Sequence, residues 1–220
     1  MKSEMNRDER ILIAGGHGMV GSAIYRELIN SGYGSNERKG KIFRPKRSEL
    51  DYTNKEKLLI WFKENNPSIV IVAAAKVGGI LANNTFKSDF LLENMNIQNN
   101  LIETAWRYGV KKLLFLGSSC IYPKFCPQPI KEEYLLTGSL EDTNQWYALA
   151  KISGLKLCEA LSKQYNFNAI SLMPTNLYGP GDNYDQFNSH VLPALIRKFS
   201  EAKREKFKEI TCWGDGSPLR

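Results

Sequence analysis

Four side chains near the middle of the sequence could together move protons at a carbonyl group: the hydroxyl of Ser118, the thiol of Cys120, the phenol of Tyr147 and the ammonium of Lys151. Tyr147 and Lys151 lie four residues apart in a stretch with helical periodicity, so both side chains leave the same face of a helix. We expect the cation to lower the pKa of the phenol from its ordinary value of about 10. The phenol could then protonate a carbonyl oxygen that the Ser118 hydroxyl holds in place.

The elements that must position these groups follow from the hydrophobic pattern. Short apolar runs alternate with longer amphipathic ones, which is typical of parallel strands joined by helices. We therefore predict an α/β fold with a doubly wound parallel sheet of the Rossmann type. The predicted strands are Ile11–Ala14, Lys41–Phe43, Ile69–Ala74, Lys112–Leu116 and Ala169–Met173. The predicted helices are Met19–Ser31, Lys55–Asn65, Asp89–Tyr108, Asn144–Tyr165 and Val191–Ala202.

The first predicted strand ends in a glycine-rich turn that leads directly into a helix: Gly15, Gly16, His17, Gly18, Met19, Val20 and Gly21. Gly15 permits a tight turn, Gly18 lets backbone N–H groups approach a pyrophosphate, and Gly21 lets the helix lie close to the strand. The phosphates would meet the positive end of the helix. An ordinary strand-to-helix turn is the alternative interpretation, but the position after the first strand favours a dinucleotide site.

The segment after the second predicted strand indicates which dinucleotide binds. Proteins that prefer NAD usually place an acid there, whereas this chain has Arg44, Lys46 and Arg47. Such side chains can neutralise the 2′-phosphate of NADP, unless they merely decorate a surface turn. We therefore predict NADP as the cofactor, with Arg44 and Arg47 as contacts. Asp51 is predicted either to approach the adenine or to cap the helix that follows Asn54.

Composition argues against several other classes of protein. The net charge is +7 and the pI is about 9.1, but basic and acidic residues are interleaved along most of the chain, so we expect no nucleic-acid partner. The four cysteines form no Cys-x-x-Cys pair and have no histidine at metal spacing, so we expect neither a metal site nor a disulfide framework, and a reducing cytoplasm fits. No apolar stretch approaches the roughly 20 residues that cross a bilayer, so we expect no membrane association.

The glycine turn followed by Ser118, Tyr147 and Lys151, in this order, resembles the extended short-chain dehydrogenase/reductase family. Within that family, four stretches resemble the GDP-L-fucose synthases. These stretches are Ala73 to Ile80, Gly117 to Pro123, Met173 to Pro180 and Asn188 to Val191. The resemblance runs from about residue 11 to residue 220. It implies an enzyme that takes a GDP-linked 4-keto sugar, GDP-4-keto-6-deoxy-D-mannose, inverts C3 and C5, and reduces C4 with NADPH to give GDP-L-fucose.

The resemblance also implies a role for individual residues. Ser118, Tyr147 and Lys151 would form the reductase triad, while Cys120 and His190 would be the acid and base of the two inversions. Further cofactor contacts would fall on Leu116, Gly117, Ser118, Ser119, Lys151, Pro174, Thr175, Asn176, Leu177 and His190, with Arg47 on the 2′-phosphate. Substrate contacts would fall on Lys198, Trp213 and Arg220. Taken alone, Cys120 would be read as a small buried apolar residue and His190 as a hydrogen-bonded polar residue near a helix start, but their matching contexts together favour the catalytic roles.

The sequence departs from the family pattern in two respects. Many relatives carry a basic residue where this chain has His17, and the family continues for about a third more of its length. The resemblance therefore implies a Rossmann domain over residues 1–175 and an incomplete substrate-binding lobe over residues 176–220. It also implies a homodimer that is joined through the two long helices predicted at Asp89–Tyr108 and Asn144–Tyr165.

Three alternatives to this function remain. The first is an epimerase or reductase of another GDP-4-keto sugar, such as a GDP-heptose, and the second is a non-catalytic NADP-binding protein. The third, a 4,6-dehydratase, is disfavoured because those enzymes have an Asp-Glu pair where this chain has Cys120 and Ile121.

Overall fold

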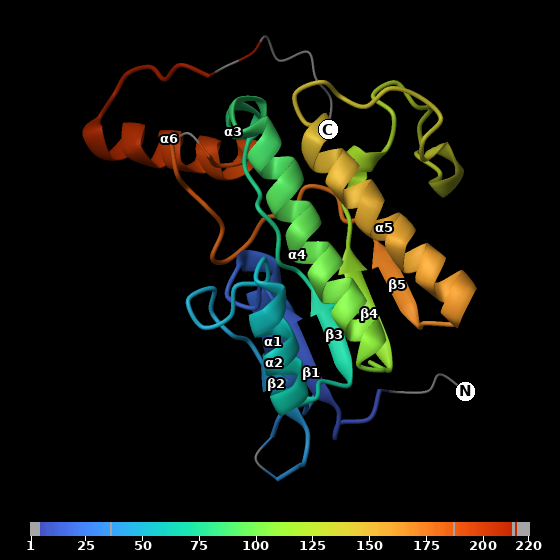
Figure 1. Cartoon of the computed structure of the whole chain (residues 1–220). Helices are drawn as coiled ribbons and strands as arrows, with labels where there is room; N and C mark the ends of the chain where they lie inside the picture. The colour runs from blue at the N-terminus through green and yellow to red at the C-terminus, as the bar shows by residue number, and fades with distance from the viewer. Residues whose placement is uncertain (1–4, 36, 187, 213, 215–220) are drawn as a thin grey trace.

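The structure is a computed structural model, and it describes residues 5–35, 37–186, 188–212 and 214. Its centre is a parallel sheet of five strands in the order β2-β1-β3-β4-β5 (Figure 1). The strands are β1 (Arg10–Ala14), β2 (Lys41–Phe43), β3 (Ile69–Val72), β4 (Lys112–Leu116) and β5 (Ala169–Leu172). The predicted doubly wound α/β fold is therefore confirmed.

One face of the sheet is covered by three helices: α2 (Lys55–Asn65), α4 (Lys87–Arg107) and α5 (Gln145–Tyr165). Figure 1 shows α4 and α5 side by side along this face. The core beneath them contains apolar side chains from alternate strand positions, among them Leu12, Val70 and Leu113, all fully buried. Burial of this kind supplies most of the favourable free energy of folding.

On the opposite face of the sheet, α1 (Met19–Asn30) covers β1 and β3, whereas Ile170 and Leu172 of β5 are exposed. Ile11, Ile13, Ile69 and Ile71 are buried there against apolar side chains of that helix. Because β1 and β3 have buried residues on both faces, their sequences are continuous apolar runs without alternation, as expected for the inner strands of a parallel sheet.

Two helices lie beyond the carboxyl ends of the strands, α3 (Ile80–Thr85) and α6 (Val191–Glu205) (Figure 1). Short 3-10 turns follow β4 at Ser119–Ile121 (η1) and precede α5 at Glu132–Tyr134 (η2). The sequence pattern predicted neither the 3-10 turns nor α3, because elements this short show no periodicity. The other elements have the predicted bounds or differ from them by one to three residues at an end.

Among the residues that the structure describes, no helix is both long enough and apolar enough to span a bilayer. The division of the chain at residue 175 into a Rossmann domain and a substrate-binding lobe stays a prediction.

Candidate active site

The turn between β1 and α1 has the geometry of a phosphate-binding loop. Gly15 has a φ of +80°, a conformation that disfavours side chains, and the Gly18 N–H donates to the Gly15 carbonyl at 3.0 Å. Gly18 is the N-cap of α1 and brings no side chain to cap the helix. The first backbone N–H groups of α1 therefore face outward from a helix end that carries partial positive charge, which suits an anionic group.

Gly21 lets α1 lie directly against this turn. A Cβ atom at position 21 would be 2.2 Å from the Gly15 carbonyl oxygen and 2.7 Å from the Gly16 Cα. Both neighbours are backbone atoms and cannot rotate away. Close packing between the helix and the strand is therefore possible only without a side chain here, as the sequence predicted.

Arg44 borders the glycine turn. Its guanidinium lies 3.6 Å from the centroid of the Tyr25 ring, and its Nη1 donates to the Gly16 carbonyl at 3.2 Å. The His17 ring contacts the Arg44 carbonyl at 2.8 Å. Arg44 and His17 thus border the glycine turn; the cofactor contacts of both residues, and that of Arg44 with a 2′-phosphate, stay predictions.

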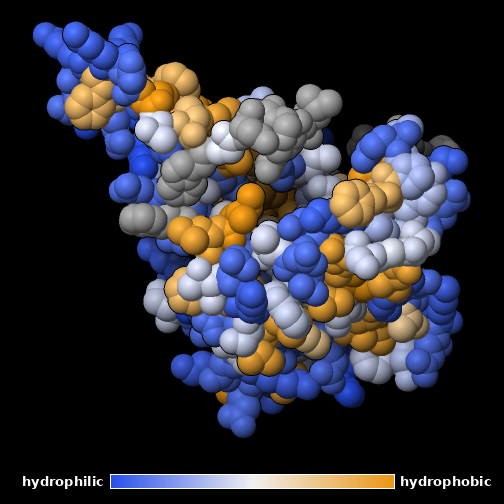
Figure 2. All heavy atoms as spheres, turned by 90° about the horizontal axis from the view of Figure 1, so that it is seen from above, coloured by the Kyte–Doolittle hydropathy of each residue, from blue (hydrophilic) through white to orange (hydrophobic). Residues whose placement is uncertain are grey.

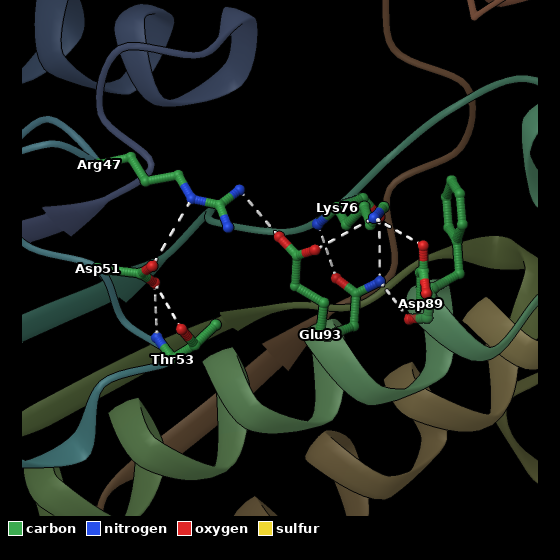
Figure 3. A network of polar contacts seen from close by, with 8 residues as sticks. Arg47, Asp51, Thr53, Lys76, Asp89 and Glu93 are labelled. Atoms are coloured by element: carbon green, nitrogen blue, oxygen red, sulfur yellow. Dashed lines mark hydrogen bonds and ion pairs between the residues drawn. The ribbon is translucent and has the colours of Figure 1, made fainter. Parts of the chain in front are cut away.

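Arg47, on the loop that follows β2, belongs to a network of charges (Figure 3). Its Nη1 lies 2.9 Å from the Glu93 carboxylate, and its Nε lies 3.9 Å from Asp51. Asp51 accepts hydrogen bonds from the backbone and side chain of Thr53. These bonds hold the pKa of Asp51 below its usual value against the opposing effect of burial.

One of the two predicted roles for Asp51 is wrong. Asp51 does not cap α2, because Asn54 is itself the N-cap and accepts from the Lys57 N–H at 3.0 Å. Instead, the short Asp51 side chain closes a local turn with Thr53. Its approach to an adenine stays a prediction.

Tyr147 and Lys151 lie in the first two turns of α5, as their spacing predicted. Lys151 is 4 % exposed, its Nζ donates to the Leu116 carbonyl at 2.8 Å, and the same atom lies 5.7 Å from the centroid of the Tyr147 ring. Burial lowers the pKa of Lys151 to about 8, although the neighbouring Cys120 opposes this shift.

The predicted effect of Lys151 on the phenol is wrong. Burial raises the pKa of Tyr147 above 10, and the nearby Cys120 raises it further. The ammonium does not reverse this, because it donates to the Leu116 carbonyl and lies 5.7 Å from the ring centroid. The phenol therefore keeps its proton at neutral pH.

Ser118 and Cys120 follow β4 and lie beside this pair. Ser118 caps η1, and its hydroxyl oxygen accepts from the Cys120 N–H at 3.4 Å. Burial raises the pKa of the Cys120 thiol, while hydrogen bonds with Ser118 and Asn144 and the charge of Lys151 oppose the rise. The structure thus brings Ser118, Cys120, Tyr147 and Lys151 into one electrostatically coupled cluster, as predicted.

Two loops at the carboxyl edge of the sheet frame this cluster. The Gly117 N–H donates to the Leu172 carbonyl at 2.8 Å, and the Ser119 N–H donates to the Pro174 carbonyl at 3.1 Å. The predicted cofactor segments that begin at Leu116 and Pro174 are therefore neighbours. Thr175, Asn176 and Leu177 continue the second loop and are exposed.

A cavity of about 750 Å³ lies between α3, α6 and the segment that follows α6. His190, the N-cap of α6, and Lys198 both line it, together with apolar residues such as Ile80 and Phe207. Figure 2 looks onto the carboxyl edge of the sheet and shows apolar atoms gathered in the hollow at its centre. The meeting of His190 with Cys120 at one sugar stays a prediction, and the predicted substrate residues Trp213 and Arg220 lie outside the described residues.

The sequence patterns did not predict the polar residues that hold the Lys76 loop, the Cys120 thiol and Arg47. Asn94 of α4 is 2 % exposed and bonds both backbone groups of Lys76, and Asn144 bonds the Cys120 thiol. Glu93 pairs with both Arg47 and Lys76. Asn94 is a polar residue at a core position of an amphipathic helix, and this was the feature of the sequence that could have indicated a buried polar contact.

Comparison with known proteins decides the family. The sequence pattern of the NAD dependent epimerase/dehydratase family matches residues 11–220. The chain belongs to the NAD dependent epimerase/dehydratase family. Within this family it is similar to GDP-L-fucose synthase 1 from Arabidopsis thaliana, with 53 % identity over 220 residues, which are 100 % of this chain and 66 % of the relative.

Two solved structures extend the comparison within the NAD dependent epimerase/dehydratase family. A GDP-L-fucose synthetase from Naegleria fowleri bound to NADP matches with a TM-score of 0.85 and 32 % identity, over 98 % of this chain and 69 % of that one. A GDP-D-glycero-L-gluco-heptose synthase from Campylobacter jejuni, solved with NADPH, matches with a TM-score of 0.82 and 40 % identity, over 91 % and 57 %. The resemblance to GDP-L-fucose synthases is thus confirmed, and the chain spans 66 % of the length of the curated relative.

Proposed function

We propose that this chain carries the cofactor site and the catalytic residues of an NADPH-dependent enzyme that converts GDP-4-keto-6-deoxy-D-mannose into GDP-L-fucose. The observation that carries the proposal is the cluster of Ser118, Cys120, Tyr147 and Lys151 at the carboxyl edge of a parallel sheet, beside a glycine turn that suits a pyrophosphate. The similarity to GDP-L-fucose synthases supports the same assignment.

The residues present fit NADPH, which supplies a hydride when bound. The N-terminal end of α1 would hold the pyrophosphate, and Arg44 and Arg47 would bind the 2′-phosphate. The backbone at Leu116 to Ser119 and at Pro174 to Leu177 would line the nicotinamide half, as the hydrogen bonds between these loops support. One of the two solved neighbours is bound to NADP and the other was solved with NADPH, which agrees with this choice.

Reduction of C4 needs a proton donor at the ketone oxygen. Tyr147 suits this role because burial keeps its phenol protonated at neutral pH. The Ser118 hydroxyl would donate a second hydrogen bond to the same oxygen and so stabilise the charge that develops there. Lys151, with a pKa of about 8, is mostly charged at pH 7 and adds a positive field beside that oxygen.

Inversion of C3 and C5 needs a base on one side of the sugar ring and an acid on the other. Each carbon is adjacent to the ketone, so loss of its proton leaves an enolate whose charge lies on the oxygen that Tyr147 and Ser118 hold. A half-buried thiol with a raised pKa favours Cys120 as the acid that returns a proton. We assign His190 as the base from the resemblance to GDP-L-fucose synthases; it lines the cavity at α6 together with Lys198.

The quaternary arrangement that we propose is a homodimer joined through α4 and α5. These helices cover one face of the sheet, and apolar side chains remain exposed on them, including Leu92 at 60 % and Leu149 at 40 %. A second copy could bury both residues. Replacing Leu92 with Glu should then shift the sedimentation coefficient from that of a dimer to that of a monomer, and an unchanged coefficient would exclude this interface.

A GDP-4-keto-heptose is the second candidate substrate. It is favoured by the similarity to the Campylobacter jejuni heptose synthase, at 40 % identity. The two sugars differ in the substituent at C6, so the same catalytic residues would serve either. A non-catalytic NADP-binding protein is disfavoured, because the phenol and the buried ammonium of a reductase are both present.

The proposal is tested by mixing the chain with NADPH and each keto sugar in turn and following the absorbance of the reduced nicotinamide. The Arabidopsis thaliana relative at full length serves as the positive control. We expect NADPH to be oxidised with the deoxymannose derivative. The product should be GDP-L-fucose, identified by its mass and retention time. Oxidation with the heptose alone would assign the second substrate, and binding of NADPH without any turnover would contradict an enzymatic role.

A further inference from the structure

A single carboxylate holds two cations beside the predicted cofactor site. Glu93 of α4 lies 2.9 Å from Arg47 Nη1 through one oxygen and 3.2 Å from Lys76 Nζ through the other (Figure 3). Asp51 and Asp89 flank the pair at 3.9 Å from Arg47 and 3.7 Å from Lys76. Three carboxylates thus surround two cations, with Glu93 at the centre.

The partners of Glu93 come from the loops on both sides of the glycine turn. Arg47 follows β2 and Lys76 follows β3, and both strands are neighbours of β1 in the sheet. Because the carboxyl ends of parallel strands meet at one edge, the network lies at the edge that also carries the turn. The network therefore lies at the edge where the cofactor is proposed to bind, and Arg47 is its member predicted to meet the 2′-phosphate.

The lysine and the carboxylate are fixed more firmly than the arginine. The buried Asn94 side chain accepts from the Lys76 N–H at 2.8 Å and donates to the Lys76 carbonyl at 3.0 Å, which ties this loop to α4. The Glu93 side chain is 20 % exposed, whereas that of Arg47 is 70 % exposed. Arg47 is thus a solvent-accessible guanidinium drawn toward an anchored carboxylate.

We propose that Glu93 sets the cofactor preference of this chain by competing with the 2′-phosphate of NADPH for Arg47; this inference rests on the proposed function. A phosphate that binds Arg47 must either displace Glu93 from the guanidinium or share the guanidinium with it. The phosphate is also repelled by the Glu93 carboxylate at close range. Both effects oppose the 2′-phosphate. Neither acts on NADH, which has a hydroxyl group at that position.

The competition predicts the sign and size of one substitution. Glu93→Gln removes the negative charge and keeps the shape, so Arg47 becomes available to the phosphate. Exposed ion pairs of this kind change an equilibrium by up to about fivefold. We expect Glu93→Gln to bind NADPH roughly two- to fivefold more tightly and NADH unchanged, with the gain shrinking as salt is added because exposed charges are screened.

Glu103 provides a matched control on the same helix. It also pairs with two cations, Lys55 and Arg107, each at 2.7 Å. Ten residues separate it from Glu93, which is about 15 Å along an α-helix. Glu103→Gln therefore loses comparable ion pairs away from the turn, and both nucleotides should bind it as they bind the wild type.

The experiment measures dissociation constants of NADPH and NADH by nucleotide fluorescence for the wild type, Glu93→Gln, Arg47→Gln and the double variant. Support requires that Glu93→Gln tightens NADPH alone and that this gain disappears in the Arg47→Gln background. Weaker NADPH binding, an equal change for NADH, or a gain that persists without Arg47 would overturn the inference. A wild type that binds NADPH selectively, with no change in Glu93→Gln, overturns this inference alone, whereas a wild type that binds neither nucleotide overturns the proposed function as well.

Discussion

An alanine at position 21 would place a methyl group inside the backbone of the glycine turn, whereas an alanine at position 18 would not. The added Cβ at position 21 would lie 2.2 Å from the Gly15 carbonyl oxygen, 2.7 Å from the Gly16 Cα and 2.8 Å from the Gly15 carbonyl carbon. At position 18 the nearest atom is the Gly15 oxygen at 3.4 Å, and φ is −72°. The two glycines thus serve different purposes, and the two substitutions separate them.

Two opposing effects decide the stability of Gly21→Ala, and the destabilising one is larger. Overpacking costs about 1–3 kcal/mol, and backbone neighbours that cannot rotate away favour the upper end of that range. Replacing glycine by alanine inside a helix returns about 1 kcal/mol of helix propensity. The net loss for Gly21→Ala is then about 2 kcal/mol, which lowers the melting temperature by about 4–8 °C for a chain of this size.

Gly18→Ala should have the reverse phenotype. Alanine is a poorer N-cap than glycine, which costs less than about 1 kcal/mol of stability. The methyl group lies at the end of α1 where the pyrophosphate is proposed to bind, so NADPH affinity should fall about tenfold or more, which corresponds to at least about 1.4 kcal/mol. Differential scanning calorimetry and a fluorescence titration measure the two quantities. Wild-type stability in Gly21→Ala would exclude the close packing of α1 on the turn, and wild-type affinity in Gly18→Ala would exclude pyrophosphate binding at this helix end.

Three further predictions follow from buried polar groups. Asn94→Ala leaves the backbone groups of Lys76 without their partner, so urea unfolding should report a loss of about 3 kcal/mol; a loss below 1 kcal/mol would exclude this anchoring. The pKa of Lys151 is lowered from 10.5 to about 8, so between these values the unfolded state binds the proton that the folded state has lost. Unfolding free energy should therefore rise with pH in the wild type relative to Lys151→Met, by at most about 1.4 kcal/mol per pH unit, and parallel curves would contradict the shift. Lower exposure and a raised pKa should make Cys120 react with iodoacetamide more slowly than the exposed Cys212, which peptide mass spectrometry measures; equal rates would argue against the raised pKa.

The fold could be predicted because its signals are local. Each strand is a short apolar run and each long helix an amphipathic one, and β1 leads into its glycine turn without a break. The helix of Tyr147 and Lys151 followed from the same patterns, whereas its grouping with Ser118 rested on the residue types and the family resemblance. By contrast, α3 has six residues, fewer than two full helical turns, and leaves no periodic trace.

The electrostatic details could not be predicted, because they depend on burial and on distant partners. The spacing of Tyr147 and Lys151 correctly predicted one helix face, but the sign of the phenol's pKa shift depends on desolvation, which the spacing does not reveal. The Arg47 partner Glu93 is 46 residues away in sequence and lies on another element. Asp51 caps its own turn instead of α2 because Asn54 is better placed.

In the proposed mechanism one oxygen site serves both reduction and inversion, with Tyr147 as the donor for the first and Cys120 as the acid for the second. The most direct test is incorporation of solvent deuterium at C3 and C5 of the keto sugar, measured by NMR for Tyr147→Phe and Cys120→Ser. We predict that Tyr147→Phe still incorporates deuterium but no longer oxidises NADPH, and that Cys120→Ser loses incorporation while reducing a sugar that is already inverted. Full deuterium incorporation by Cys120→Ser would contradict the account.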